Sequence, residues 1–254
     1  MGTPDALAWA GIASAVTAAI AYGGVRQRRR ARLVERTPTT SAASLEGGEV
    51  VEIKGRVVAA EQTLETPLSR RSAVWMHVKV KEAQGSSSTT LVDEARAVEF
   101  LIDDGSGRMA RAVPRAHENG VVAHDSDGQW ENETEGPREH VLELLRASGH
   151  KDFDPTKLSW TERALFVGDP VYVLGHAEPI VGPPVADGYR SNPSSQLVLR
   201  GTAEAPLTIA AMTEEQFVAR LKSSAATYFG CATAVAIIGF VVSLVALNDC
   251  TGGD

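Results

Sequence analysis

The sequence predicts a mainly β (α+β) fold, in which an antiparallel β-barrel domain with one or two helices is held between two transmembrane α-helices. An uncharged apolar run near each end of the 254-residue chain predicts the two spans. Between these runs, several segments alternate apolar and polar residues with the period of a β-strand, which predicts the barrel. The part left between the spans has the size of one ordinary domain.

The first apolar run, Leu7–Val25, contains no charged residue and is about 28 Å long as a helix at ~1.5 Å per residue. Residues 1–25 are therefore predicted to form a transmembrane helix. A cluster of arginines follows directly: Arg26, Arg28, Arg29, Arg30 and Arg32. A cleaved signal peptide carries its positive charge before the apolar run, so we expect an uncleaved anchor. The positive-inside rule predicts that the arginine side faces the cytoplasm.

The second apolar run is Ala225–Leu247, which is also uncharged and is preceded by Arg220 and Lys222. A capping-box pattern of Thr213 and Gln216 predicts a helix that begins at residue 213 and continues through this span to residue 247. Residues 248–254 form a short acidic tail. Both basic flanks point toward the middle of the chain, so we expect an integral membrane protein with two spans, a cytoplasmic domain and both termini outside.

Small residues recur at i, i+4 in the first span, at Gly11, Ala15, Ala19 and Gly23. Such a stripe allows close approach of two helices. It is compatible with packing between the two spans and with self-association of copies, and the sequence leaves both open.

Residues 26–48 are predicted as the basic flank and a polar linker, and the β domain is expected over 49–212. Strands are predicted over 50–61, 73–83, 168–180, 194–201 and 207–211, and a hairpin over 97–113 with its turn at 103–107. One helix is predicted over 136–150, and the acidic segment 117–136 is predicted to be irregular. Five or so strands with a glycine-centred first strand favour an OB-like barrel. A generic antiparallel sheet with helices on one side remains the alternative.

Composition argues against several functions. A formal net charge of -7 and an aromatic content of 6% argue against a nucleic-acid partner. The six histidines show no tight ligand spacing, and the two cysteines, Cys231 and Cys250, lie inside the second span and just past it. We therefore predict no metal, no cofactor and no catalytic residue, and a binding module rather than an enzyme.

One loop carries the candidate ligand-binding residues. A rigid Pro-Leu-Ser turn delivers two arginines beside a strand with a tryptophan, a combination suited to an anionic or planar group or to membrane headgroups. The alternative is a turn whose arginines pair with surface acids. The residues concerned are Pro67, Leu68, Ser69, Arg70, Arg71 and Trp75.

Six segments in this order resemble the GIDE domain, also called BAM: Gly55–Val58, Thr66–Trp75, Val98–Ala116, His140–His150, Trp160–Ala177 and Leu207–Gln216. This domain occurs in E3 ubiquitin ligases of mitochondria and chloroplasts and in bacterial membrane proteins. The resemblance implies a domain held between two transmembrane helices, here in a bacterial inner membrane. Positions that match the family as framework are Asp103, Asp104, Gly105, Gly107, Glu162, Gly168, Asp169, Tyr172 and Gly175.

The resemblance also implies what to expect of ubiquitin transfer. In the family this looks to be the work of a RING finger after the second span, and a RING needs several Cys and His zinc ligands. The residues after Leu247 include one cysteine and no histidine, so we expect no ligase activity in this polypeptide. The family commonly has Pro-Cys where this chain has Ser72-Ala73, so any role of that cysteine is lost.

These observations predict a membrane-anchored, non-catalytic binding, sensing or scaffolding module. Its expected partners are membrane lipids and an unidentified protein. The alternative is an E3 ubiquitin ligase-like protein that acts only with a separate catalytic subunit.

Overall fold

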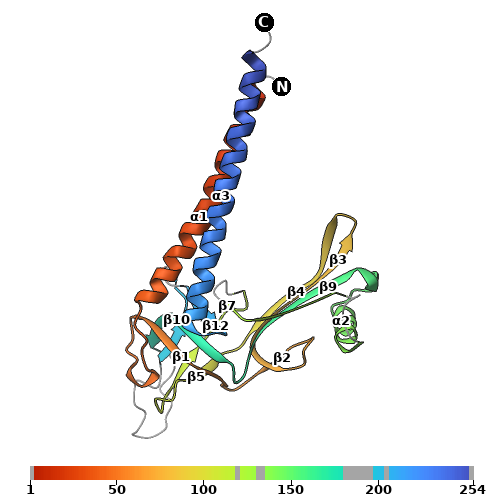
Figure 1. Ribbon diagram of the computed structural model, residues 1–254. Coiled ribbons are helices and arrows are strands. Elements are labelled where there is room, and N and C mark those ends of the chain that lie inside the picture. Colours follow the sequence, from red (N-terminus) through yellow and green to blue (C-terminus); the bar gives the residue numbers. More distant parts are fainter. Residues whose placement is uncertain (1–2, 118–120, 130–134, 180–196, 203–205, 252–254) are drawn as a thin grey trace. The chain divides into compact units, whose positions relative to one another are not determined.

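The computed structural model describes residues 3–117, 121–129, 135–179, 197–202 and 206–251. The chain forms two compact units (Figure 1). Residues 1–36 and 214–254 make up a helical unit, and residues 37–213 make up a β unit.

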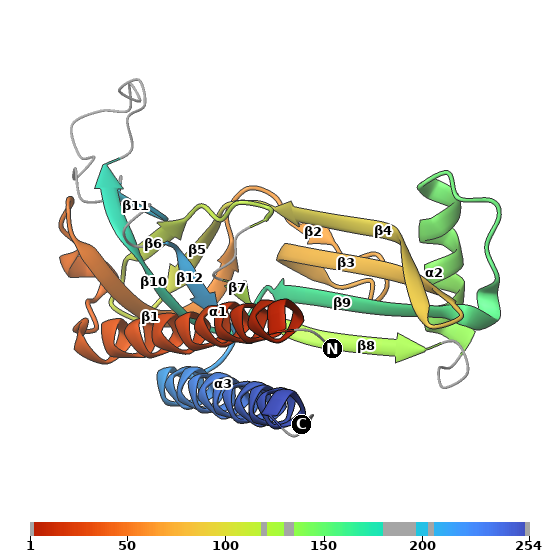
Figure 2. The same cartoon turned by 90° about the horizontal axis from the view of Figure 1, so that it is seen from above.

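The helical unit consists of α1 (Thr3–Arg36) and α3 (Glu214–Thr251), which run antiparallel and side by side (Figures 1 and 2). The basic flank predicted to follow the first span is part of the same helix. The rings of Tyr228 and Phe229 pack on Gly23 and Gly24, where a Cβ would lie only 3.2 Å and 3.0 Å from them. Glycine at these two positions therefore allows the close approach of the helices.

Two transmembrane spans were expected, and one helix has the length and composition of a span. In the described part of the chain, α3 alone contains a stretch long and apolar enough to cross a membrane, Glu214–Val242. The predicted helix from residue 213 is confirmed as a continuous helix, and it continues into the predicted tail as far as Thr251.

The β unit contains a closed barrel of five strands. They are β1 (Val50–Ala59), β5 (Phe100–Asp103), β6 (Met109–Ala112), β10 (Pro170–Pro179) and β11 (Leu197–Arg200). The pairing runs β1-β5-β6-β11-β10 and returns to β1, with only β6 and β11 parallel. The predicted small closed barrel is thereby confirmed, as is the hairpin turn between Asp103 and Met109. Two short strands extend the sheet from β10: β12 (Thr208–Ala210) and β7 (Val121–Val122).

A second sheet was not predicted. It consists of β2 (Leu64–Glu65), β3 (Ser72–Gln84), β9 (Leu158–Phe166) and β8 (His124–Gln129), with β4 (Ser87–Ala97) also paired to β3 (Figure 2). The prediction that 117–136 is irregular was wrong, because β8 pairs with β9 over six positions. The two strands are about 35 residues apart in sequence, so no local pattern indicates their pairing. With this second sheet, the fold is mixed α/β rather than a barrel with helices alone.

Helix α2 (Glu135–Ala147) covers one face of the second sheet, and the predicted helix is confirmed. Val141 and Leu145 are fully buried and pack with Val78, Val80 and Trp160 of the sheet. The helix ends at Gly149 (φ +83), where the main-chain N–H of His150 bonds to Leu145 O at 3.0 Å.

The two cores of the β unit share the strands β3 and β9. Val74, Trp75 and Leu165, where these strands meet the barrel, pack into the barrel core. Further along the same strands, Val78 and Trp160 pack beneath α2. The continuous strands therefore join the barrel and the second sheet as one piece.

The predicted polar linker is packed against the barrel rather than free. Ala42 and Leu45 are buried in the barrel core, and Ala42 N donates to Asp104 Oδ2 at 2.7 Å. Thr39 Oγ1 donates to the buried carboxyl group of Glu52 at 2.8 Å. The segment packs, rather than forming a free linker, because burial of the apolar Ala42 and Leu45 is favourable.

Barrel closure depends on a close approach at Gly55 in β1, where a Cβ would lie 2.4 Å from Asp103 O. We predict that Gly55→Ala destabilises the full chain by about 2–3 kcal/mol, because β1 and β5 must separate to admit the methyl group. Thermal unfolding in detergent, followed by tryptophan fluorescence, measures this. Gly47→Ala is the control, since its nearest neighbour would be at 3.4 Å, and an equal loss in both variants contradicts the prediction.

Candidate functional site

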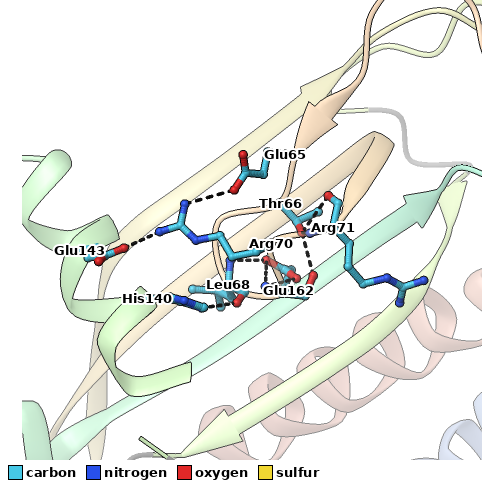
Figure 3. A network of polar contacts seen from close by, with 9 residues as sticks. Glu65, Thr66, Leu68, Arg70, Arg71, His140, Glu143 and Glu162 are labelled. Carbon is cyan, nitrogen blue, oxygen red and sulfur yellow. Dashed lines mark hydrogen bonds and ion pairs between the residues drawn. The ribbon is translucent and has the colours of Figure 1, made fainter. Parts of the chain in front are cut away.

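The loop between β2 and β3 forms a tight turn closed on itself (Figure 3). Two hydrogen bonds join Thr66 and Arg71 at its base. Thr66 N donates to Arg71 O at 3.0 Å, and Arg71 N donates to the side-chain Oγ1 of Thr66 at 3.0 Å. The hydroxyl groups of Thr66 and Ser69 lie 2.7 Å apart. Arg70 has a φ of +53, a left-handed conformation uncommon for a residue with a side chain.

The carboxyl group of Glu162 accepts hydrogen bonds from this turn on the side that faces β9. Glu162 lies on β9 and is only 3% exposed. It accepts the main-chain N–H of Leu68 at 2.7 Å and that of Ser69 at 3.1 Å (Figure 3). The turn therefore has its inward N–H groups satisfied by a side chain 94 positions further along the chain.

Helix α2 holds the same turn from the other side. His140 donates from Nδ1 to Leu68 O at 2.6 Å. Arg70 pairs with Glu143 of α2 and, at 3.5 Å, with Glu65 (Figure 3). The side chains of Arg70, Glu65 and Glu143 are all exposed to solvent, so these two ion pairs add little stability.

The candidate ligand-binding residues thus have contacts within the protein. The Arg71 guanidinium lies 3.5 Å from the ring centroid of Phe166. Arg70 pairs with surface acids, as the alternative interpretation of the loop expects. Trp75 is 3% exposed and donates from Nε1 to Ala116 O at 3.1 Å. Pro67 lies in the turn beside Leu68. A ligand-binding role of these residues stays a prediction.

A hollow of about 210 Å³ opens beside Trp75 on the second sheet. His77 on β3 is paired with Ala95 on β4 and with Arg163 on β9, so these three residues form a row across the strands. Ala116 and His117, which follow β6, also line the hollow. Its lining residues are Trp75, His77, Ala95, Ala116, His117, Val121 and Arg163.

The imidazole of His77 is oriented by Asp93. Its Nε2 donates to Asp93 Oδ1 at 2.6 Å, and Lys79 Nζ lies 2.7 Å from Asp93 Oδ2. The hydrogen bonds from Lys79 and His77 lower the pKa of Asp93 to about 2. Asp93 is therefore ionised at neutral pH and fixes which imidazole nitrogen faces it. The ring of His77 stands edge-on to that of Trp75, at 6.4 Å between centroids.

Most of the family-matched framework residues have structural partners at turns and strand contacts. The carboxylates of Asp103 and Asp104 accept the N–H groups of Gly105 and Ser106, each at 2.9 Å. Burial of Asp104 opposes ionisation, but hydrogen bonds from the Ser106 side chain and from the main-chain N–H groups of Ala42 and Ser106 lower its pKa below the ordinary value. Gly107 continues this turn with a φ of +85.

The remaining matched positions shape the start of β10. Asp169 accepts Phe166 N at 2.8 Å, next to Gly168 with a φ of +92. Tyr172 donates from its hydroxyl group to the buried carboxyl group of Glu52 at 3.1 Å. A Cβ at Gly175 would lie 2.8 Å from Leu207. These contacts are those of a framework, with close packing and satisfied hydrogen bonds.

Sequence reasoning did not single out the hollow or the support of the turn. His77, His117, Arg163 and His140 come from four separate segments, which only the sheet and α2 bring together. One signal was available for Glu162. It lies in phase with Leu158, Trp160 and Ala164, which marks it as a carboxyl group on a buried strand face. Over the described residues, no three His, Cys, Asp or Glu side chains are arranged to hold a metal ion.

We predict that Glu162→Ala costs about 2–4 kcal/mol of stability, because the buried N–H group of Leu68 and the partly buried one of Ser69 lose their acceptor. It should also speed tryptic cleavage after Arg70 and Arg71 by loosening the turn. Glu162→Gln keeps one acceptor oxygen and should cost less. Thermal unfolding and timed proteolysis of the full chain measure both effects. Glu143→Gln is the exposed control, and a Glu162→Ala protein as stable as this control contradicts the role assigned to Glu162.

Comparison with known proteins gives one family. The model of the GIDE family, described as E3 ubiquitin ligase, matches residues 76–245, well over half of the chain. The matched range includes most lining residues of the hollow and Glu162, and it begins just after the Pro67–Trp75 segment. No curated protein and no solved structure matches the chain. The family match agrees with the resemblance in the sequence, and the chain belongs to the GIDE family.

Proposed function

We propose that this protein is a membrane-anchored, non-catalytic binding module that holds a protein partner at the cytoplasmic surface of a membrane as a sensor or scaffold. The observation that carries this proposal is the hollow beside Trp75. It combines the Trp75 ring, the imidazole of His77 and the guanidinium of Arg163 on paired strands with the imidazole of His117 in the loop after β6. Such a mixture of apolar surface and a few polar groups is typical of recognition sites.

The chemistry of the hollow favours an acidic group of the partner. Arg163 carries a positive charge, and the ring of His117 can donate a hydrogen bond from one of its nitrogens. Asp93, which contacts His77, is already paired with Lys79 and the imidazole. A carboxylate side chain or a chain terminus is the ligand that these donors fit.

Anchoring is supported by α3. Three residues separate the end of β12 at Ala210 from the start of α3 at Glu214, so the β unit is tethered closely to the apolar helix. Within that helix Ile237, Ile238 and Phe240 are 58%, 63% and 65% exposed, which suits contact with lipid rather than with water.

We extend this proposal to α1 as a second span, with both chain ends outside. The Leu7–Val25 run is uncharged, and α1 lies antiparallel to α3. The basic flanks of the two helices, at Arg26–Arg32 and at Arg220 and Lys222, therefore lie at the same end of the pair. The positive-inside rule assigns that end to the cytoplasm.

The barrel supports an OB-type assignment. In order along the chain, its first strand pairs with the second and the fourth, and its third pairs in parallel with the fifth. This is a five-stranded barrel with a crossed, non-sequential connection, as in OB folds. OB folds serve many ligands, so the barrel type names no partner.

A ubiquitin-ligase role is the second candidate, and the description of the family model favours it. Each zinc ion of a RING takes four Cys or His ligands, and this sequence has two cysteines. In this candidate the chain acts as the membrane-bound adaptor of a separate catalytic subunit. Recovery of a ubiquitin-conjugating enzyme on the hollow would select this candidate.

The orientation depends on the arginines after the first apolar run. Replacing Arg26, Arg28, Arg29, Arg30 and Arg32 by Gln, and inserting five arginines before Leu7, should invert or mix the topology. Reporter fusions at the N-terminus and in the β unit measure it. The control replaces the same five arginines by lysine and should keep the original topology. Unchanged reporters in the Gln variant would refute the charge argument.

The binding role is tested at the hollow itself. A photo-crosslinking amino acid at His117 of the full-length protein in membranes should give a discrete adduct, whereas the same group at Ser86, in the β3–β4 turn, should not. Arg163→Gln should weaken the His117 adduct about tenfold, since it removes a charge-assisted hydrogen bond. Equal adducts at both positions, or no effect of Arg163→Gln, would overturn the assignment of the hollow.

A further inference from the structure

A second hollow, of about 370 Å³, lies between α1 and α3. The two helices run side by side in both views (Figures 1 and 2). Its lining residues are Arg28, Ala31, Arg32, Glu35 and Lys222. It lies wholly within the helical unit, so its geometry depends only on the packing of these two helices.

Close helix packing on either side of the hollow fixes its walls. Toward the apolar runs, the Phe229 ring packs on Gly24, and the Arg28 guanidinium stacks over that ring at 4.6 Å. Toward the other end, Lys222 Nζ and Glu35 Oε1 lie 2.6 Å apart. Ala31 is 2% exposed and is too small to fill the space. Arg28 and Arg32, one helical turn apart, therefore flank an open space.

The charge of the hollow is positive. Three cations and one carboxylate line it, which leaves two uncompensated positive charges even with the Lys222–Glu35 pair formed. Arg26, Arg29 and Arg30 add to the potential along the same stretch of α1. Cations held this close repel one another, and an anion that contacts several of them relieves the repulsion.

The place of the hollow along both helices indicates the kind of anion. Arg28 follows the apolar run of α1 that ends at Val25, and Lys222 precedes the apolar run of α3 that begins at Ala225. In a membrane, both residues would lie about one helical turn from the hydrocarbon core, which is the depth of lipid phosphates. Arginine forks match phosphate geometry and donate two hydrogen bonds at once.

We propose that the hollow between α1 and α3 binds the phosphate group of an anionic phospholipid through Arg28, Arg32 and Lys222. The proposal rests on the membrane anchoring proposed above and gives it a specific lipid contact. Stacking on Phe229 holds the Arg28 guanidinium at the edge of the hollow before a lipid binds. The bound lipid then ties α1 to α3 at the headgroup level and favours one packing of the pair.

Native mass spectrometry of the full-length protein in detergent tests this, with titrations of phosphatidylglycerol and phosphatidylcholine. We expect phosphatidylglycerol to bind about tenfold more tightly or better. The combined variant Arg28→Gln, Arg32→Gln, Lys222→Gln should lose this preference. The matched control Arg26→Gln, Arg29→Gln, Arg36→Gln removes as many charges outside the hollow and should keep most of it. Equal losses in the two variants would show a diffuse charge effect and overturn the site.

A gain-of-affinity variant keeps the test decisive if the triple variant misfolds. Glu35→Gln removes the acid that lines the hollow and releases Lys222, so it should raise phosphatidylglycerol affinity about threefold. Unchanged or weaker binding would contradict the proposal. If inorganic phosphate at millimolar concentration displaces the lipid, the hollow is a site for free phosphate and the lipid assignment fails.

Alkaline extraction of membranes separates failure of this inference from failure of the anchoring proposal. Release of the native protein by carbonate would refute anchoring, and with it the lipid site. A protein that resists extraction but shows no preference for phosphatidylglycerol would refute the lipid site alone.

Discussion

The β unit depends on the approach of β1 to β5 at Gly55, where the Asp103 carbonyl group occupies the space of a side chain. Strand β1 pairs with both β5 and β10, so it is the strand through which the barrel closes. With closure, Ile53, Phe100 and Val173 become fully buried in one core. The strands β3 and β9 connect this core to the second one, since they pack in the barrel core at one end and beneath α2 further along.

Two buried carboxyl groups connect segments that are far apart in the sequence. Glu52 accepts from Thr39 and Tyr172, and so joins the entry segment to β1 and β10. Glu162 accepts from the turn between β2 and β3. A buried carboxyl group is stable only with its hydrogen bonds made, so each of these also specifies which loop packs on which strand. The conformation of Arg70 persists because this turn is held from both sides.

The proposed binding chemistry separates into two sites with different physical bases. The hollow beside Trp75 is lined by residues of β3, β4 and β9 and of the loop after β6, and the acidic group proposed to bind there would meet the Arg163 guanidinium and the His117 ring. The hollow between the long helices is built on a glycine contact and an ion pair, and it presents a cluster of cations. A protein partner and a lipid could therefore be bound at once by different parts of one anchored chain.

The sequence by itself determined the features that depend on neighbouring residues. The strands of the barrel, the hairpin turn at Asp103, helix α2 and the apolar α3 follow from periodicity, turn residues and composition, which act within a few positions. Only the tertiary structure decided the rest. The pairing of β8 with β9, the role of Glu162 beneath Leu68, and the row of His77 and Arg163 join residues tens of positions apart. Such contacts form because the folded chain buries and pairs them together, and no local pattern encodes which distant partner will be met.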